Sequence, residues 1–214
     1  MYRTGFGMMS PAVKNLLLAN IAVFLVQILW RNIPFELWFG LVPILVVKKL
    51  FIWQIVTYMF LHADLGHIFF NMLALWMFGV QLEQNWGTRE FLRYYFFTGI
   101  VAGVCILLWP FIWGGSPMAP TIGASGAVFG ILVAFALFFP DVYIFVNFLF
   151  PIKAKYAVVL FILLELYMLP GNDNVSHIAH LGGAVAGYFY IRRRYRYLGI
   201  GQNFFRDFFK KKPW

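Results

Sequence analysis

A serine and four histidines are the residues of this chain whose types and positions could do chemistry. Ser125 opens one long apolar run, within the segment Gly-Ala-Ser-Gly, and His180 stands near the start of another. A histidine that accepts the hydroxyl proton converts a serine into a nucleophile. Ionisable groups inside apolar runs are costly and by default indicate function. Ser125 is therefore a candidate nucleophile, and His180 a candidate general base.

Two further polar residues could stabilise the oxyanion of such a reaction. His67 and Asn71 stand four positions apart, so on a helix they project from one face. Their side-chain donors could join the Ser125 backbone N–H in an oxyanion hole. Phe129, one helical turn after Ser125, could stack on the imidazole. No Asp or Glu is near enough in the sequence to orient the base, so we expect a Ser-His dyad and not a triad.

Each of these residues also has a purely structural interpretation. A serine at a helix start is more often a cap, and a histidine in a membrane helix is more often a hydrogen-bonded structural group. Gly126 and Gly130, like Gly183 and Gly187, have the four-residue spacing of close helix packing. Packing and chemistry are compatible, because glycine faces would let the two helices approach until serine and histidine touch.

Composition determines which elements must position these residues. The 214 residues are 62% hydrophobic and 12% charged, against about 45–50% apolar and about 25% charged in soluble domains. This excludes a soluble enzyme and a disordered chain. The net charge of +9 has no soluble basic domain to carry it, so we expect no nucleic-acid partner. The single cysteine, Cys105, excludes a disulfide framework.

The apolar runs predict an all-α, polytopic membrane protein with six transmembrane helices, the lipid bilayer being its environment. The predicted spans are residues 14–30, 66–82, 91–111, 124–139, 156–169 and 177–191. We expect a single domain over 1–214, with a core of about 14–191 and a basic tail of 192–214. The segment 31–65 is too apolar for a plain loop and predicts a structured element in the membrane interface.

The distribution of basic residues predicts the orientation in the membrane. Fourteen of the 17 Lys and Arg residues fall on one side of the predicted spans and three on the other. Both termini are therefore expected in the cytoplasm. The second, fourth and sixth spans then begin at the outer face, where their N–H groups and partial positive charge would stabilise an anion. Ser125 and His180 would share a depth of roughly 5–10 Å, at about 1.5 Å per residue.

Three motifs resemble the signatures of the rhomboid intramembrane serine proteases. They are Gly-Ala-Ser-Gly at 123–126, His-x-x-x-Asn at 67–71, and Ala-His-x-x-Gly-x-x-x-Gly at 179–187. The segment Gly-Val-Gln-Leu-Glu at 79–83, before Trp-Gly at 86–87, is similar as well. The resemblance covers most of residues 50–190. It implies a six-span fold without a cofactor.

The resemblance also implies roles for individual residues. Ser125 would be the nucleophile and His180 the general base, because His180 and not His177 has glycines three and seven positions later. His67, Asn71 and the Ser125 amide would form the oxyanion hole. The supporting residues would be Gly123, Gly126, Phe129, Gly183 and Gly187. His62 would belong to a structural hydrogen-bond network.

This chain departs from the family pattern at two positions. Gln54 follows Trp53 where the family often has arginine, which removes a charge from the first loop. Phe129 stands where some members have tyrosine, so it can stack but not hydrogen-bond. Neither departure touches the dyad.

The expected function is cleavage of single-span membrane proteins near the outer face, in a bacterial plasma membrane because no Arg-rich transit segment is visible. We expect water to reach the serine through a polar cavity between the second, fourth, fifth and sixth spans. One alternative is a non-catalytic rhomboid-like protein that binds membrane helices, although such relatives typically lack the serine or the histidine. Another is a metal site on the four histidines and Asp64, but no His-Glu-x-x-His is present. Glu165 is isolated and predicts a buried or end-of-span hydrogen bond.

Overall fold

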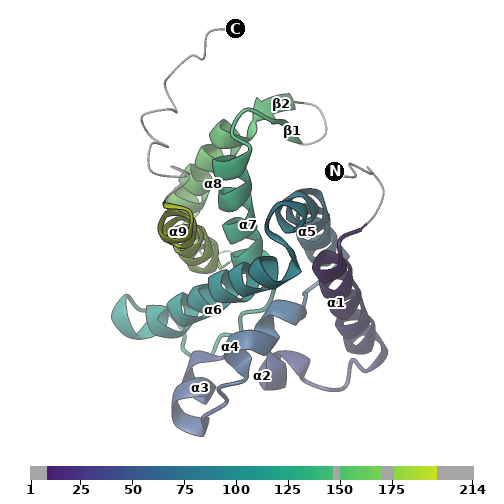
Figure 1. Ribbon diagram of the computed structural model, residues 1–214. Coiled ribbons are helices and arrows are strands. Elements are labelled where there is room, and N and C mark those ends of the chain that lie inside the picture. Colours follow the sequence, from purple (N-terminus) through teal and green to yellow (C-terminus); the bar gives the residue numbers. More distant parts are fainter. Residues whose placement is uncertain (1–8, 147–149, 170–175, 197–214) are drawn as a thin grey trace, which may run out of the picture.

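The computed structural model describes residues 9–146, 150–169 and 176–196, which form a helical bundle with one small sheet (Figure 1). The tail from residue 197 onward, whose basic residues contributed to the predicted orientation, lies outside the described residues, as does Arg3. The long helices are α1 (Pro11–Leu29), α5 (Leu65–Trp86), α6 (Thr88–Ile112), α7 (Ser125–Phe138), α8 (Ala154–Met168) and α9 (His177–Arg194). Each falls on one predicted span, with ends that differ by a few residues.

Among the described helices, α1, α5 and α6 are long and apolar enough to cross a membrane. Helix α7 is apolar but has 14 residues. It lies in the interior of the bundle, where it packs against α5, α6, α8 and α9. Ten of its residues are buried, so neighbouring helices replace lipid around most of its surface. The chain is thus a mostly helical integral membrane protein.

The mostly helical fold departs from the predicted all-α class in one place. Strands β1 (Tyr143–Val146) and β2 (Phe150–Lys153) form an antiparallel pair between α7 and α8, with Tyr143 opposite Lys153. Asp141 holds the base of this hairpin through Lys153 Nζ at 3.3 Å and Lys155 Nζ at 3.1 Å. A short apolar run can be a strand or part of a helix, and periodicity alone does not distinguish the two.

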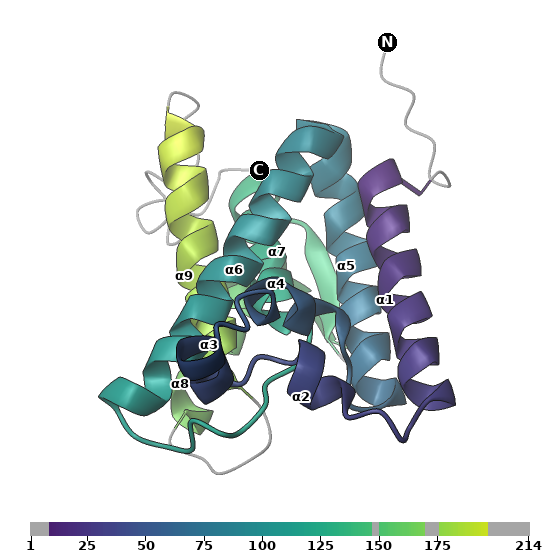
Figure 2. The same ribbon diagram turned by 90° about the horizontal axis from the view of Figure 1, so that it is seen from below.

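Helices α5, α7 and α9 begin at the same end of the bundle. Figure 2 shows the first turns of α5 and α9 at the lower end, opposite the first turn of α1. Contacts between Gly123 and His67, and between Ser125 and His180, bring the start of α7 to this end. Polar residues from three separate segments therefore meet at one depth.

Glycines set the distance between α7 and α9. A Cβ on Gly183 would collide with the carbonyl oxygen of Gly126, and one on Gly187 would lie 3.1 Å from Gly130 Cα. Tyr94 Oη donates a hydrogen bond to Gly130 O at 2.6 Å, which ties α6 to the same crossing. The predicted close packing of the two glycine faces is confirmed.

The carboxylate of Glu83 joins α1, α5 and α6 at the other end of the bundle. It accepts hydrogen bonds from Ser10 Oγ, the Ala12 and Val13 amides and Thr88 Oγ1. Two of these donors are free N–H groups in the first turn of α1, which a helix leaves without an internal partner. Glu83, only 2% exposed, thus acts as a cap supplied by a neighbouring helix.

The segment 31–65 is structured, as predicted. It contains α2 (Phe35–Phe39), α3 (Pro43–Lys49), α4 (Gln54–Thr57) and the 3₁₀ helix η1 (Tyr58–Phe60). Gln54 is fully buried, accepts from the Val42 amide at 3.1 Å and donates to Leu37 O at 2.8 Å. An uncharged amide can do both, which explains how the segment is held without the arginine of the family pattern.

This segment also holds the chain that leads into Ser125. Leu41 and Thr121 exchange two backbone hydrogen bonds, of 2.8 and 2.9 Å, and the Gly123 amide donates to Tyr58 O at 2.8 Å. The approach to α7 is therefore fixed from two sides.

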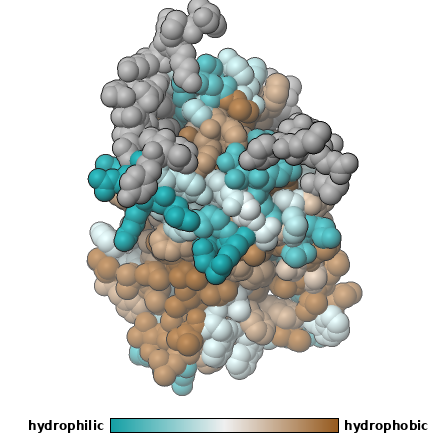
Figure 3. Space-filling model, viewed as in Figure 1, coloured by the Kyte–Doolittle hydropathy of each residue, from teal (hydrophilic) through white to brown (hydrophobic). Residues whose placement is uncertain are grey.

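Large apolar side chains remain exposed around the bundle. Figure 3 shows hydrophobic residues covering α6 and the side near α1, whereas hydrophilic residues gather in the middle of the same face. On α1, Leu18 and Leu25 are more than half exposed, and on α6 Phe111 is too. Such a surface is stable in lipid and not in water.

Candidate active site

Ser125 is the first residue of α7, and its hydroxyl faces α9. The preceding residue, Ala124, occupies the cap position and has no side-chain cap bond. Ser125 Oγ lies 2.7 Å from His180 Nε2. This is hydrogen-bond distance for a serine and the base that would take its proton.

Phe129 holds the imidazole of His180 from one side. The two rings are stacked, with centroids 4.4 Å apart and planes inclined by 7°. The predicted stacking is confirmed. Because Phe129 lies one turn after Ser125, a single helix supplies both the hydroxyl and the ring that limits rotation of the imidazole.

The expectation that no carboxylate reaches the histidine is wrong. Glu165 of α8 places Oε2 2.9 Å from His180 Nδ1, on the side of the ring opposite Ser125. This contact is not a well-aligned hydrogen bond, and it becomes an ion pair only when His180 is protonated. The same oxygen lies 2.6 Å from Nδ1 of His177.

A signal for Glu165 is present in the sequence. A carboxylate in a membrane helix needs a partner. In the predicted orientation the fifth span runs outward, so its final residues are expected at the depth at which the sixth span and its two histidines begin. The contact between Glu165 and His180 is not obvious from the sequence, because the two residues are 15 positions apart.

His67 faces the backbone just before Ser125. Its Nδ1 accepts from the Ala63 amide at 3.3 Å, which assigns the proton of a neutral ring to Nε2. A Cβ on Gly123 would lie 2.7 Å from that Nε2, and Gly123 has a φ of +126°. Both the close approach and the backbone conformation favour glycine here. The result is an N–H donor beside the start of α7.

Asn71 lies one turn after His67 on the same face of α5, as predicted. Its Nδ2 donates to His67 O at 2.9 Å. An amide nitrogen carries two hydrogens, so this bond uses one donor and leaves the second for another acceptor. Asp64 caps α5 by accepting from the His67 amide at 2.8 Å. Thus α5 presents its first turn in a fixed orientation.

His62 is 1% exposed, and its environment differs from the predicted hydrogen-bond network. Its backbone exchanges hydrogen bonds with the Gln27 side chain, whereas its ring nitrogens make no well-aligned hydrogen bond among the described residues and lie near the backbone of Phe60. Burial, together with the nearby His67 ring at 5.0 Å, lowers the pKa of His62 to about 4. The ring is neutral at ordinary pH.

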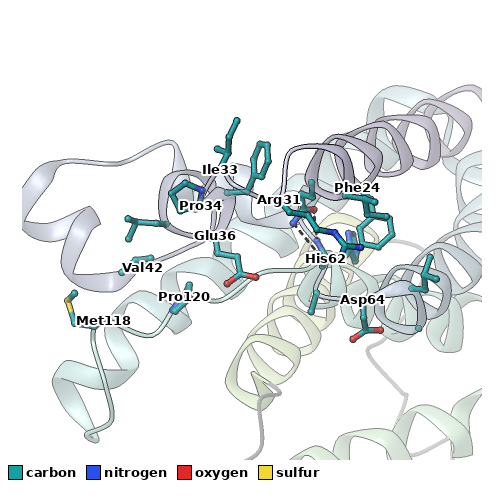
Figure 4. A pocket seen from close by; sticks show the side chains of 17 residues that line it. Phe24, Arg31, Ile33, Pro34, Glu36, Val42, His62, Asp64, Met118 and Pro120 are labelled. Atoms are coloured by element: carbon teal, nitrogen blue, oxygen red, sulfur yellow. Dashed lines mark hydrogen bonds between the residues drawn. The ribbon is translucent and has the colours of Figure 1, made fainter.

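A cavity of about 900 Å³ opens beside His62, between the end of α1, α2 and the start of α5. In Figure 4, Arg31, Glu36 and Asp64 lie among apolar side chains along its wall. This cavity is lined by His62 but not by Ser125, His180, His67 or Asn71. It differs in place from the polar cavity expected between the second, fourth, fifth and sixth spans.

One group of described residues could hold a metal ion. Glu165, His177 and His180 each offer a ligand atom, and these atoms lie within 4.8 Å of one another. The two short contacts to Glu165 Oε2 also account for the cluster without an ion, because His177 Nδ1 can donate to the carboxylate and His180 Nδ1 lies beside it. His62, His67 and Asp64 form a separate group around the start of α5.

Comparisons with known proteins agree with the resemblance of the motifs. The family model described as Rhomboid domain matches residues 49–197. Rhomboid protein 1, mitochondrial, of Saccharomyces cerevisiae is 32% identical over 188 residues, which cover 83% of this chain and 52% of that protein. RHOMBOID-like protein 12, mitochondrial, of Arabidopsis thaliana is 29% identical over 187 residues, covering 80% and 55%.

Bacterial relatives are similar to a shorter part of the chain. Rhomboid protease GluP of Bacillus subtilis is 31% identical over 141 residues, which cover 64% of this chain and 25% of that protein. The chain spans about half the length of the first two relatives. Since the family model covers more than half of the chain, including Ser125, His180 and the start of α5, this protein belongs to the rhomboid family.

Proposed function

We propose that this protein is an intramembrane serine endopeptidase that cleaves transmembrane segments of other membrane proteins. The observation that carries the proposal is the 2.7 Å distance between Ser125 Oγ and His180 Nε2 at the start of two membrane helices. Membership of the rhomboid family and relatives that are named proteases support it.

In the proposed reaction His180 takes the Ser125 proton at Nε2 while Oγ attacks the substrate carbonyl carbon. The oxyanion is held by the Ser125 amide, the Nε2–H of His67 and the free N–H of Asn71. The protonated His180 then donates its proton to the leaving amine, which leaves an acyl ester on Ser125. Water, activated by the same imidazole, hydrolyses the ester and restores the enzyme. No cofactor takes part.

We propose a six-span arrangement in which α1, α5, α6, α7, α8 and α9 cross the membrane as one domain. Its core covers about 14–191, and the basic tail is 192–214. Both termini are cytoplasmic, so cleavage takes place near the outer face.

The substrates are single-span proteins whose helix unwinds at the cut, because a helical carbonyl is shielded by its own hydrogen bond. We propose a bacterial plasma membrane as the location; the first two relatives are mitochondrial proteins and do not support this part of the proposal.

Two other functions are the alternatives to this proposal. A non-catalytic member of the family would bind membrane helices with the same fold, but it would have no need of a serine and a histidine at 2.7 Å. A metal-dependent protease could use Glu165, His177 and His180. These alternatives predict different responses to mutation and to a chelator.

The decisive experiment uses purified protein in liposomes with a model transmembrane substrate. Wild type, Ser125→Ala and His180→Ala are compared, with a parallel wild-type sample in chelator and a fluorophosphonate label for the serine. We expect cleavage and labelling by wild type, loss of both in the two variants, and no effect of the chelator. Cleavage by Ser125→Ala that the chelator stops would identify a metalloprotease. A wild type that neither cleaves nor takes up the label would indicate a binding protein.

A further inference from the structure

Glu165 is the one acidic side chain among the residues of α8, and it lies where acid is least expected. Its neighbours at the end of α8 face outward: Leu164 is 46% exposed, Leu166 50% and Tyr167 83%. The Glu165 side chain is 14% exposed. The helix end thus presents apolar groups to the membrane and turns its single carboxylate toward α9.

The partners of this carboxylate are both imidazoles. Glu165 Oε2 lies 2.9 Å from His180 Nδ1 and 2.6 Å from His177 Nδ1. An ionised carboxylate in an apolar region is stable only where donors or positive charge compensate it. Two N–H groups on one oxygen supply that compensation when both rings carry their proton on Nδ1.

This arrangement determines which nitrogen of His180 can act as a base. With Nδ1 protonated beside Glu165 Oε2, the lone pair of the neutral ring lies on Nε2, 2.7 Å from Ser125 Oγ. The opposite tautomer would put hydrogen on Nε2 and could not accept the serine proton. The carboxylate also lies next to the ring that becomes positively charged during the reaction.

We propose that Glu165 is a positioning residue for His180 and that the site operates as a Ser125–His180–Glu165 triad. This inference rests on the proposed serine protease function. Glu165 touches neither substrate nor the reacting atoms. It selects the tautomer of His180, and it stabilises the imidazolium that forms when Ser125 Oγ attacks. The imperfect alignment of the contact is compatible with this role, because catalytic hydrogen bonds often tighten only when substrate binds.

The test compares two substitutions that separate charge from size. Glu165→Gln keeps the length of the side chain and removes the charge; Glu165→Asp keeps the charge and shortens the chain by one methylene. We expect kcat of Glu165→Gln to fall about 10- to 10³-fold, less than the roughly 10⁴-fold seen where a triad carboxylate is buried and fully aligned. KM should stay within about twofold, since substrate is not contacted. Glu165→Asp should retain several-fold more activity than Glu165→Gln.

A matched control is Glu90→Gln, which removes a carboxylate from α6 that pairs with Arg93, Tyr190 and Arg194, away from Ser125. Its kcat should stay within about twofold of wild type. The rate of fluorophosphonate labelling of Ser125 should follow kcat across the series, because labelling needs the activated serine but no protein substrate. Nitrogen NMR of labelled histidine gives an independent readout, with His180 protonated on Nδ1 in wild type and in mixed tautomers in Glu165→Gln.

The outcomes distinguish the two proposals. If wild type is labelled and Glu165→Gln is labelled and cleaves at the same rate, the triad is wrong and the serine protease function stands. Activity of Glu165→Gln equal to or above that of Glu165→Asp would likewise overturn the triad, because a merely structural hydrogen bond favours the isosteric amide. A wild type without labelling would overturn the protease function and the triad with it. Should Glu165→Gln fail to fold, a His180 ring protonated on Nε2 in wild type would refute the assignment.

Discussion

The distance between Ser125 and His180 depends on the close crossing of α7 and α9. Gly183 lies one turn after His180 on α9, and Gly126 follows Ser125 directly on α7. A Cβ on Gly183 would lie 2.7 Å from the carbonyl carbon of Gly126, and closer still to its oxygen. Carbon atoms in van der Waals contact prefer about 3.5–4.0 Å, so Gly183→Ala must separate the two helices by about 1 Å. Helix backbone cannot move aside as a flexible side chain would.

The expected consequence is a folded protein with a damaged site. A shift of about 1 Å extends the Ser125 Oγ–His180 Nε2 distance from 2.7 Å beyond hydrogen-bond range. Misplacement by about 1 Å can cost about 100-fold in rate, and overpacking a core costs about 1–3 kcal/mol. We therefore expect kcat/KM of Gly183→Ala to fall about 100-fold, with a small decrease in unfolding temperature.

The assay measures cleavage of the model substrate in liposomes, fluorophosphonate labelling and thermal unfolding in detergent. The control is Val185→Ala on the same helix, where the side chain is 55% exposed to the membrane side; it should cleave at nearly the wild-type rate. Gly183→Ala with activity within about twofold of wild type would refute the reasoning, because it would mean that the helices can separate without disturbing the serine and histidine.

Three further predictions concern stability and the interfacial segment. Glu83→Ala removes the acceptor of four hydrogen bonds that join α1, α5 and α6, so the free energy of unfolding should fall by about 3 kcal/mol. The control is Glu90→Ala in the same unfolding assay. An equally small loss of stability in both variants would contradict the role of Glu83. For His62 the folded pKa is about 4 and the ordinary value 6.5, so below pH 6.5 the unfolded chain binds a proton that the folded chain does not. The free energy of unfolding should therefore decrease as pH falls from about 6.5 to about 4, by up to about 1.4 kcal/mol per pH unit, and His62→Gln should remove this contribution from the slope; an unchanged slope in the variant would show that other groups cause it. Gln54→Ala breaks the bonds to Val42 and Leu37, so hydrogen exchange in residues 35–60 should accelerate at least tenfold, and equal exchange in both proteins would show that the segment is held by its other contacts.

The helices of this protein can be predicted from its sequence because the lipid environment restricts the backbone structures that are possible. Backbone polar groups in a membrane must be satisfied within the segment, so an apolar run of sufficient length is a helix almost by necessity. Six runs therefore predict the six long helices. The Gly-x-x-x-Gly patterns at 126–130 and 183–187 predict close packing, because only small residues let two helix backbones meet. Neither inference requires knowledge of which helices are neighbours.

Contacts that join distant segments were decided by the tertiary structure. The hairpin of β1 and β2 lies in an apolar stretch that reads equally well as the end of a helix. Glu83 stands in a motif shared with the family, yet its four donors come from helices on either side, which its sequence neighbours do not indicate. The hydrogen-bond partners of the Gln54 side chain are an amide 12 positions away and a carbonyl 17 positions away.

Glu165 shows this division most clearly. Its residue type and its place at the end of the fifth predicted span are features of the sequence alone. The same is true of Ser125 and His180 at the start of the fourth and sixth. The Glu165 carboxylate turns inward to His180 and not toward lipid. This direction depends on the rotation of α8 about its axis and on the position of α8 beside α9. Helix rotation is set by the packing of side chains from several segments at once. The sequence by itself thus determined which helices form and which groups they carry, and the tertiary structure decided which of those groups meet.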